Sequence, residues 1–206
     1  MGGHLLLPTN LEEAIEATPW HRWSGVKVLM SSTHDPYMSQ LGDSARKILE
    51  AALPKGVKFC IQTRSPLAAL DILISKKYKE QVRLQASIAT LDKQFSRLIE
   101  PRVATPEARL KLLKIAKEAG LKIGVIIAPV FPSVPQRPDW GSDLEGIFGE
   151  LAIIKPDFIY GESLHARGMN LVYLKEGLGV TIGSKELSKL DWEAGRLFKE
   201  NPKTMQ

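Results

Sequence analysis

Residues 122–130 read Lys-Ile-Gly-Val-Ile-Ile-Ala-Pro-Val, a run in which only the first side chain is charged. A parallel strand covered by helices on both faces is apolar along its whole length, whereas a strand with one face in water alternates between apolar and polar residues. The run therefore predicts a buried parallel strand. Prolines at 132, 135 and 138 follow it and predict a long loop as far as Trp140, of the kind that often closes over a ligand.

Similar runs recur on both sides of this strand, separated by segments with helical signals. We expect further strands at 26–30, 57–63, 82–89 and 158–163, and a sixth at 177–183. Helix starts are indicated by Asp43, Ser65 before a proline, Asp92, and Thr105 before a proline. The expected helices lie at 11–17, 43–53, 67–78, 92–99, 106–120, 144–154 and 184–199. This alternation predicts an α/β fold with a parallel sheet, either an open doubly wound sheet or a barrel.

The 206 residues, 44% of them hydrophobic, suit a single domain that spans 1–206. No apolar run approaches the roughly 20 residues of a membrane span, and residues 1–8 lack the pattern of a secretory leader. We therefore expect a cytosolic protein without a membrane partner. The net charge of +5 favours anionic partners such as nucleic acid or phosphate, although lysines such as Lys76 and Lys114 lie on predicted helix surfaces and are typical of a solvated face.

Cysteine occurs once, at Cys60. A single cysteine excludes an intrachain disulfide and a metal site built from this chain's cysteines. Its place inside the predicted strand 57–63 favours a small buried residue over a nucleophile.

Polar residues gather where the predicted strands end, and in parallel sheets these ends form the functional edge. Arg64 precedes a helix start and could hold a carboxylate or phosphate, or could pair with a nearby acid. His34 and Asp35 are candidates for proton transfer, or form a turn. Glu100 and Arg102 flank a proline, and we expect a structural ion pair between them, with a ligand contact as the alternative.

The end of the fifth expected strand carries Glu162 and His165, a conceivable catalytic or metal-binding pair, although two ligands do not make a metal site. Three aromatic residues could stack on a ring or pack at the edge of the core: Tyr37, Trp140 and Tyr160.

Four segments taken together resemble a known family. They are Ser-Thr-His-Asp-Pro-Tyr at 32–37, Ile-Gln-Thr-Arg-Ser-Pro-Leu at 61–67, Ala-Ser-Ile-Ala-Thr-Leu-Asp at 86–92 and Leu-Ile-Glu-Pro-Arg at 98–102. In order and spacing they resemble the radical S-adenosylmethionine (radical SAM) family of spore photoproduct lyase and its relatives, often called DNA repair photolyases. The likeness covers residues 5–165.

The resemblance implies parallel strand–helix repeats that form a partial, open TIM-like barrel. It also implies S-adenosylmethionine as a cofactor, with His34 and Asp35 near its amino group. Arg64, in place of the family's lysine, would meet the methionine carboxylate, and Ser87 would lie near the ribose. In the family, three cysteines in the loop after the first strand hold a [4Fe–4S] cluster that cleaves S-adenosylmethionine.

This chain lacks those cysteines, so we expect no metal ligands in it and no ligation of the cluster. The resemblance begins after the point where the first strand and the cluster loop would lie. We therefore expect either a fragment, whose missing segment another subunit could supply, or a degenerate member that makes no radicals. An exposed sheet edge would favour such a partner or a homo-oligomer.

Two other functions remain open at this point. The chain could be a non-catalytic module that binds a nucleotide or nucleic acid at a basic strand-end face. Alternatively, it could be an unrelated TIM-barrel lyase or isomerase that uses His34 or Glu162 as a base and Arg64 as an anion clamp.

Overall fold

The computed structural model describes residues 9–30, 34–166 and 168–200. Within them, one sheet holds five parallel strands in the order β1-β2-β3-β4-β5. The strands are β1 (Lys27–Met30), β2 (Lys58–Gln62), β3 (Val82–Ser87), β4 (Lys122–Val130) and β5 (Phe158–Ser163). The five strands expected up to residue 163 are confirmed, and β1 and β5 form the two edges of an open sheet.

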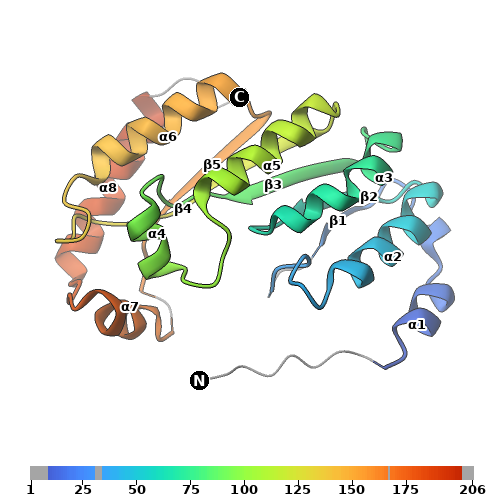
Figure 1. Cartoon of the computed structure of the whole chain (residues 1–206), viewed down its shortest axis with the longest axis horizontal. Helices are drawn as coiled ribbons and strands as arrows, with labels where there is room; N and C mark the ends of the chain where they lie inside the picture. Colours follow the sequence, from blue (N-terminus) through green and yellow to red (C-terminus); the bar gives the residue numbers. More distant parts are fainter. Residues whose placement is uncertain (1–8, 31–33, 167, 201–206) are drawn as a thin grey trace.

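Helices connect the strands and lie outside the curved sheet (Figure 1). The α-helices are α1 (Leu11–Ala17), α2 (Gly42–Ala52), α3 (Ile72–Lys77), α4 (Lys93–Ile99), α5 (Pro106–Glu118), α6 (Trp140–Ile154), α7 (Asn170–Leu178) and α8 (Ser184–Glu200). Short 3-10 segments are η1 (Trp20–Trp23), η2 (Leu53–Lys55) and η3 (Pro66–Asp71). Strand, helix and parallel strand therefore alternate as expected of an open TIM-like barrel.

Most of the expected helix starts are built from the expected caps. Asp92 accepts hydrogen bonds from the backbone N–H groups of Gln94 and Phe95, and Thr105 caps α5. The cap predicted at Asp43 is wrong, because α2 begins one residue earlier and Asp43 lies in its first turn, where it pairs with Arg46. A carboxylate there still faces the positive end of the helix.

The predicted sixth strand at 177–183 is wrong. Helix α7 occupies the first part of that segment, and Gly179 ends it with a left-handed backbone (φ +68°). The leucines of α7, at 171, 174 and 178, recur at helical spacing and pack against the core. The apolar residues of α7 therefore follow a helical period and not the period of a strand.

The two faces of the sheet differ in composition because successive side chains of a strand point to opposite sides. The face toward the helices is apolar and buried, with Phe59, Leu84 and Ile123 at most 3% exposed. We call the opposite side the open face. Its side chains are those of Lys27, Leu29, Lys58, Cys60, Gln62, Arg83, Gln85, Ser87, Lys122, Ile126, Ala128, Phe158, Tyr160 and Glu162.

The proline-rich loop after β4 is packed into the molecule. Phe131 and Val134 are buried, and the buried guanidinium of Arg137 donates to Asp143 and to the carbonyl of Phe131. Arg137 also lies over the Phe95 ring, 4.7 Å from its centroid. These contacts fix the loop against the core. They do not support the expectation that this loop closes over a ligand.

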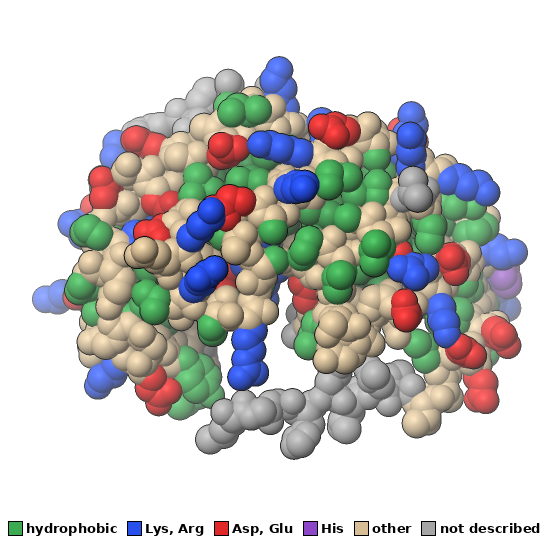
Figure 2. Space-filling model, viewed as in Figure 1, with side chains coloured by type: hydrophobic (Ala, Val, Ile, Leu, Met, Phe, Trp, Pro, Cys, Tyr) green, Lys and Arg blue, Asp and Glu red, His purple; other side chains and the backbone are tan. Residues whose placement is uncertain are grey.

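Charge is mixed over the face shown in Figure 2, where Lys and Arg side chains lie among Asp and Glu. Neighbouring helices form ion pairs at the surface, such as Lys93–Glu107 and Lys114–Glu150. The lysines of the helices are therefore a solvated, partly paired surface, as expected. In the described part of the chain, no helix is long and apolar enough to cross a bilayer.

Candidate functional site

A cavity of about 600 Å³ lies on the open face at the carboxyl ends of the strands. Its lining combines strand residues with the residues that follow them: Leu29, His34, Asp35, Gln62, Thr63, Arg64, Gln85, Ser87, Ile126, Ala128, Phe158, Tyr160 and Glu162. The structure thus brings together His34, Asp35, Arg64 and Ser87. Ser32 and Thr33 of the first motif lie outside the described residues.

Asp35 joins the chain that follows β1 to the end of β2. Its Oδ1 accepts from the Tyr37 N–H at 2.9 Å and from Thr63 Oγ1 at 2.6 Å, and its Oδ2 accepts from the Arg64 N–H at 2.6 Å. An ionised carboxylate has about four acceptor positions, so roughly one stays available to a ligand. Asp35 can therefore hold the rim together and still accept a hydrogen bond from an amino group.

Tyr37 anchors the segment that follows β1 to the core and does not stack on a ligand. Its side chain is buried, and its hydroxyl donates to Asp71 Oδ2 at 2.9 Å, while Arg46 Nε donates to Asp71 Oδ1 at 2.7 Å. Burial and the neighbouring Asp71 carboxylate raise the pKa of Tyr37 far above its usual value, so the hydroxyl remains a donor. Of the other two aromatic candidates, Trp140 packs against the core and Tyr160 faces the cavity.

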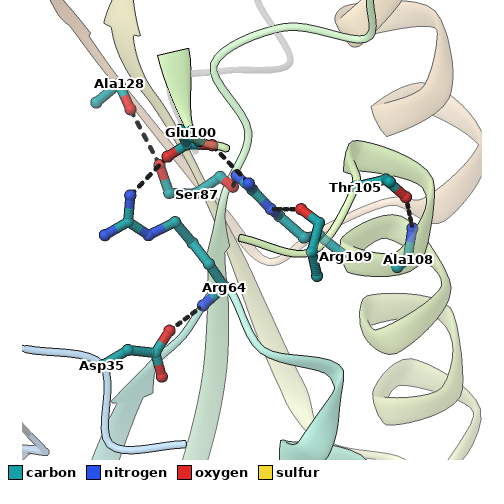
Figure 3. A network of polar contacts seen from close by, with 9 residues as sticks. Asp35, Arg64, Ser87, Glu100, Thr105, Ala108, Arg109 and Ala128 are labelled. Carbon is teal, nitrogen blue, oxygen red and sulfur yellow. Dashed lines mark hydrogen bonds and ion pairs between the residues drawn. The ribbon is translucent and has the colours of Figure 1, made fainter. Parts of the chain in front are cut away.

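Arg64 belongs to a charged network that reaches into the protein (Figure 3). Its guanidinium pairs with Glu100, whose other oxygen accepts from Arg109. The predicted ion pair between Glu100 and Arg102 is wrong. In the described part of the chain, Glu100 pairs with Arg64 and Arg109. The Arg64 side chain is 44% exposed and that of Arg109 is 1% exposed, so the network runs from the cavity rim into the core.

Arg109 holds this rim through three contacts. Besides Glu100, it donates to the carbonyl of Ala104 and to the carbonyl of Ser87, each at 2.9 Å. Burying a guanidinium is costly unless its donors and its charge are satisfied, and here they are. Arg109 therefore sets the positions of both Glu100 and the end of β3.

Ser87 has its proton already committed, because Oγ donates to the Ala128 carbonyl at 3.0 Å. A serine hydroxyl has one donor and two acceptor lone pairs. Its oxygen therefore faces the cavity as an acceptor, suited to a ligand hydroxyl that donates.

The wall formed by β5 carries Tyr160, Glu162 and, just beyond the strand, His165. The Tyr160 hydroxyl lies 3.5 Å from Oε2 of Glu162, and His165 Nε2 lies 3.8 Å from Oε1. Among the described residues, no group of three or more His, Cys, Asp or Glu side chains could hold a metal ion. The proposed Glu162–His165 pair exists, but within that part of the chain it lacks further metal ligands.

The residues present do not fit a [4Fe–4S] cluster. Such a cluster needs three thiolates from the protein, whereas Cys60 is the sole cysteine and lies in the middle of β2. Burial raises the pKa of the Cys60 thiol, although Arg83 opposes this, so the thiolate form is disfavoured.

Two parts of the site were not found from the sequence. Arg109 lies on the same face of α5 as the buried residues Leu112, Leu113 and Ala116. A charged residue on an apolar helix face indicates a buried ion pair, and this signal was present in the sequence. Gln62 and Gln85 line the cavity at paired positions of β2 and β3.

Comparisons with known proteins identify the family of the chain and its fold. Residues 2–138 match the family model described as Radical SAM superfamily. An uncharacterised protein of Acidianus two-tailed virus, ORF301, is 53% identical over 199 residues, which cover 97% of this chain and 65% of ORF301. The chain therefore spans about two thirds of the length of this relative.

Solved structures share the fold at low sequence identity. A cysteine-to-serine mutant of spore photoproduct lyase aligns with a TM-score of 0.68 at 15% identity, over 96% of this chain and 66% of the lyase. SuiB of Streptococcus suis, in a structure with bound S-adenosylmethionine, aligns with a TM-score of 0.60 at 14% identity, over 98% of this chain and 43% of SuiB.

Proposed function

The chain belongs to the radical SAM superfamily, and from that premise we propose that its cavity binds S-adenosylmethionine through His34, Asp35, Arg64 and Ser87. The observation that carries the proposal is their convergence. These four residues come from the ends of three neighbouring strands and line one cavity of a size typical of ligand sites.

The chemistry of each side chain suits a part of this ligand. A guanidinium has five N–H donors in a planar fork, so Arg64 can hold a carboxylate while it remains paired with Glu100. Asp35 can accept from the ligand's amino group beside His34, and the Ser87 oxygen can accept from a ribose hydroxyl. When bound, S-adenosylmethionine supplies the 5′-deoxyadenosyl group with which radical SAM enzymes begin their reactions.

We further propose that these 206 residues alone start no radical chemistry. They contain one cysteine, so at least two of the three thiolates that hold a cluster would have to come from outside them, as from a separate subunit. Reconstitution of the purified chain with iron and sulfide is expected to give no stoichiometric cluster absorbance. The proposed role of this chain is to bind the cofactor, in a lyase related in fold to spore photoproduct lyase or in a degenerate member of the superfamily.

Titration calorimetry with S-adenosylmethionine and S-adenosylhomocysteine tests the binding site. Arg64→Ala is expected to weaken both ligands about tenfold to a hundredfold, since a hydrogen bond to a charged group contributes about 1.5–3 kcal/mol. Arg102→Ala is a matched control, because Arg102 is exposed and lies close in the sequence to Glu100, the partner of Arg64. Equal affinities for wild type and Arg64→Ala would remove Arg64 from the site.

A second candidate function, nucleic-acid binding, is favoured by a row of basic residues on the open face. Lys27 and Lys58 are register partners, and so are Arg83 and Lys122 on the next two strands. All four are exposed, and they lie at the amino ends of the strands, opposite the cavity rim. We call them the basic row; neutralised phosphates would make such binding strongly dependent on salt.

A further inference from the structure

The floor of the cavity contains a pair of side-chain amides. Gln62 and Gln85 are register partners on β2 and β3, and Gln85 Nε2 lies 3.4 Å from Gln62 Oε1. Gln85 is only 7% exposed, yet both side chains line the cavity. A long polar side chain that is nearly buried has already lost most of its rotamer freedom, so ligand binding need not order it.

Glycine at position 124 makes room for the side chain of Gln85. A Cβ atom there would lie 3.2 Å from Gln85 Oε1 and 3.2 Å from Cδ1 of Phe158, closer than such contacts normally come. The Gln85 carbonyl oxygen therefore extends over β4 toward the Phe158 ring. Arg83 packs over that ring, 5.6 Å from its centroid.

Aromatic surface continues along the same wall. Tyr160 follows Phe158 by two residues on β5, points to the same face and is 47% exposed. The row of Gln62, Gln85, Gly124 and Phe158 crosses four strands in register and contains no charged side chain. It contrasts with the rim, where Asp35, Arg64 and Glu100 supply the charges.

The amide pair leaves a defined set of hydrogen-bonding groups. One N–H of one amide is used on the oxygen of the other, so the first still offers its carbonyl oxygen and the second its NH₂ group. This holds whichever glutamine is the donor. A side-chain amide pairs well with a ligand edge on which an acceptor and a donor are neighbours, as glutamine does with adenine.

We propose that the Gln62–Gln85 floor is a specificity-determining subsite for a planar, uncharged ligand group that has a carbonyl beside an N–H, as in a primary carboxamide or a lactam ring. The amides read this edge, and the aromatic wall of Phe158 and Tyr160 supplies a stacking surface. This inference rests on the proposed function, because it assigns the floor to the substrate and the charged rim to the cofactor.

Saturation-transfer NMR with small probes tests the subsite. Nicotinamide supplies a primary carboxamide and uracil a lactam, whereas N,N-dimethylnicotinamide and 1,3-dimethyluracil keep the rings without the N–H. We expect at least one parent compound to bind about threefold to tenfold more tightly than its methylated analogue, the range that one or two hydrogen bonds provide. Binding of nicotinamide alone selects the carboxamide, and binding of uracil alone selects the lactam.

Variants connect the preference to the floor. Gln85→Leu and Gln62→Leu are each expected to abolish the difference between parent and methylated probes, whereas Gln94→Leu, on the exposed surface of α4, keeps it. Because Gln85 is nearly buried, the half-buried Gln62 provides a variant that should fold normally. Equal binding of parent and methylated probes to the wild type would overturn the proposal, as would an unchanged preference in a folded Gln62→Leu protein.

Titration of the same proteins with S-adenosylhomocysteine separates this inference from the proposed function. Both glutamine variants are expected to keep the affinity of the wild type for S-adenosylhomocysteine within about twofold. If the probes bind selectively and S-adenosylhomocysteine does not bind the wild type, the cofactor proposal fails and the amide subsite stands. If S-adenosylhomocysteine binds and neither probe shows a preference, the subsite fails alone.

Discussion

Charged residues lie at both ends of the open face, but their side chains are held differently. At the carboxyl ends, Arg64 and Glu100 are tied through Arg109 into the core, and Asp35 accepts three hydrogen bonds from its neighbours. At the amino ends, the basic row lies exposed, with contacts such as Lys122 to Glu80 that also face solvent. The first arrangement is formed before a ligand arrives, whereas the second gives an electrostatic surface without fixed geometry.

Removal of Arg109 should have the largest effect, because it breaks the network at its buried end. Arg109→Met leaves the Glu100 carboxylate and the Ser87 and Ala104 carbonyls without this donor, and loss of one partner of a buried pair costs about 3–5 kcal/mol in the free energy of unfolding. Urea denaturation measures the loss. Arg102→Met, at an exposed arginine nearby, is expected to change stability by about 0.5 kcal/mol or less.

Asp35 should come next, since it joins two loops at the rim. Asp35→Ala removes the acceptor for Tyr37, Thr63 and Arg64, and we expect a loss of about 2–3 kcal/mol in the free energy of unfolding. Asp43→Ala is the comparison, because that carboxylate pairs with Arg46 at the surface. If both variants unfolded at the same urea concentration, the rim would not be held by Asp35.

At the amino ends, substitutions should leave stability unchanged and alter only binding to a polyanion. Lys27→Ala with Lys58→Ala is expected to weaken duplex DNA binding about tenfold and to reduce the slope of log K against log salt by about 2, one for each lost phosphate contact. Lys76→Ala with Lys77→Ala on α3 removes the same charge from the helical side. An equal loss in both double variants would mean that net charge, and not the basic row, attracts the DNA.

The smallest effect is expected at Asp157, just before β5. Burial alone would raise the pKa of Asp157, but hydrogen bonds from the Ile123 N–H and from Lys117 outweigh it and lower the pKa. A lowered pKa in the folded state gives stability that is fully present above the ordinary carboxyl pKa of about 3.9 and is lost as the pH falls through the lowered value.

Asp157→Asn should therefore destabilise the protein at pH 7 by about 0.5 kcal/mol, a modest figure because the side chain is partly exposed and screened. The difference from wild type should disappear in strongly acidic buffer. Denaturation curves at both pH values test this, and a difference that grew on acidification would contradict the sign.

Features that depend on local sequence patterns could be predicted, whereas features that depend on contacts distant in the sequence could not. The five strands and the positions of His34, Asp35, Arg64 and Ser87 follow from local patterns, since the residue after each apolar run must lie at the carboxyl edge of a parallel sheet. The partner of Glu100 could not be predicted, because Arg64 and Arg109 are 36 and 9 residues away and meet it only through the crossover of α4 and α5.

The predicted sixth strand failed for a similar reason. A strand was expected at 177–183, but packing of leucines from α7 against the core selects a helix for the first part of that segment. The amide pair in the cavity floor depends on strand register, which one sequence does not specify. The cytosolic location and the oligomeric state stay predictions.

A crystal structure of the chain grown with S-adenosylhomocysteine tests the central claim most directly. The account predicts one ligand in the cavity, with its carboxylate on the guanidinium of Arg64, its amino group beside Asp35 and a ribose hydroxyl within hydrogen-bond distance of Ser87. Arg109 and Glu100 should keep their present contacts, because the rim is formed in advance. A ligand bound at the basic row, or a cavity that stays empty at saturating ligand, would contradict the assignment of the carboxyl end as the cofactor site.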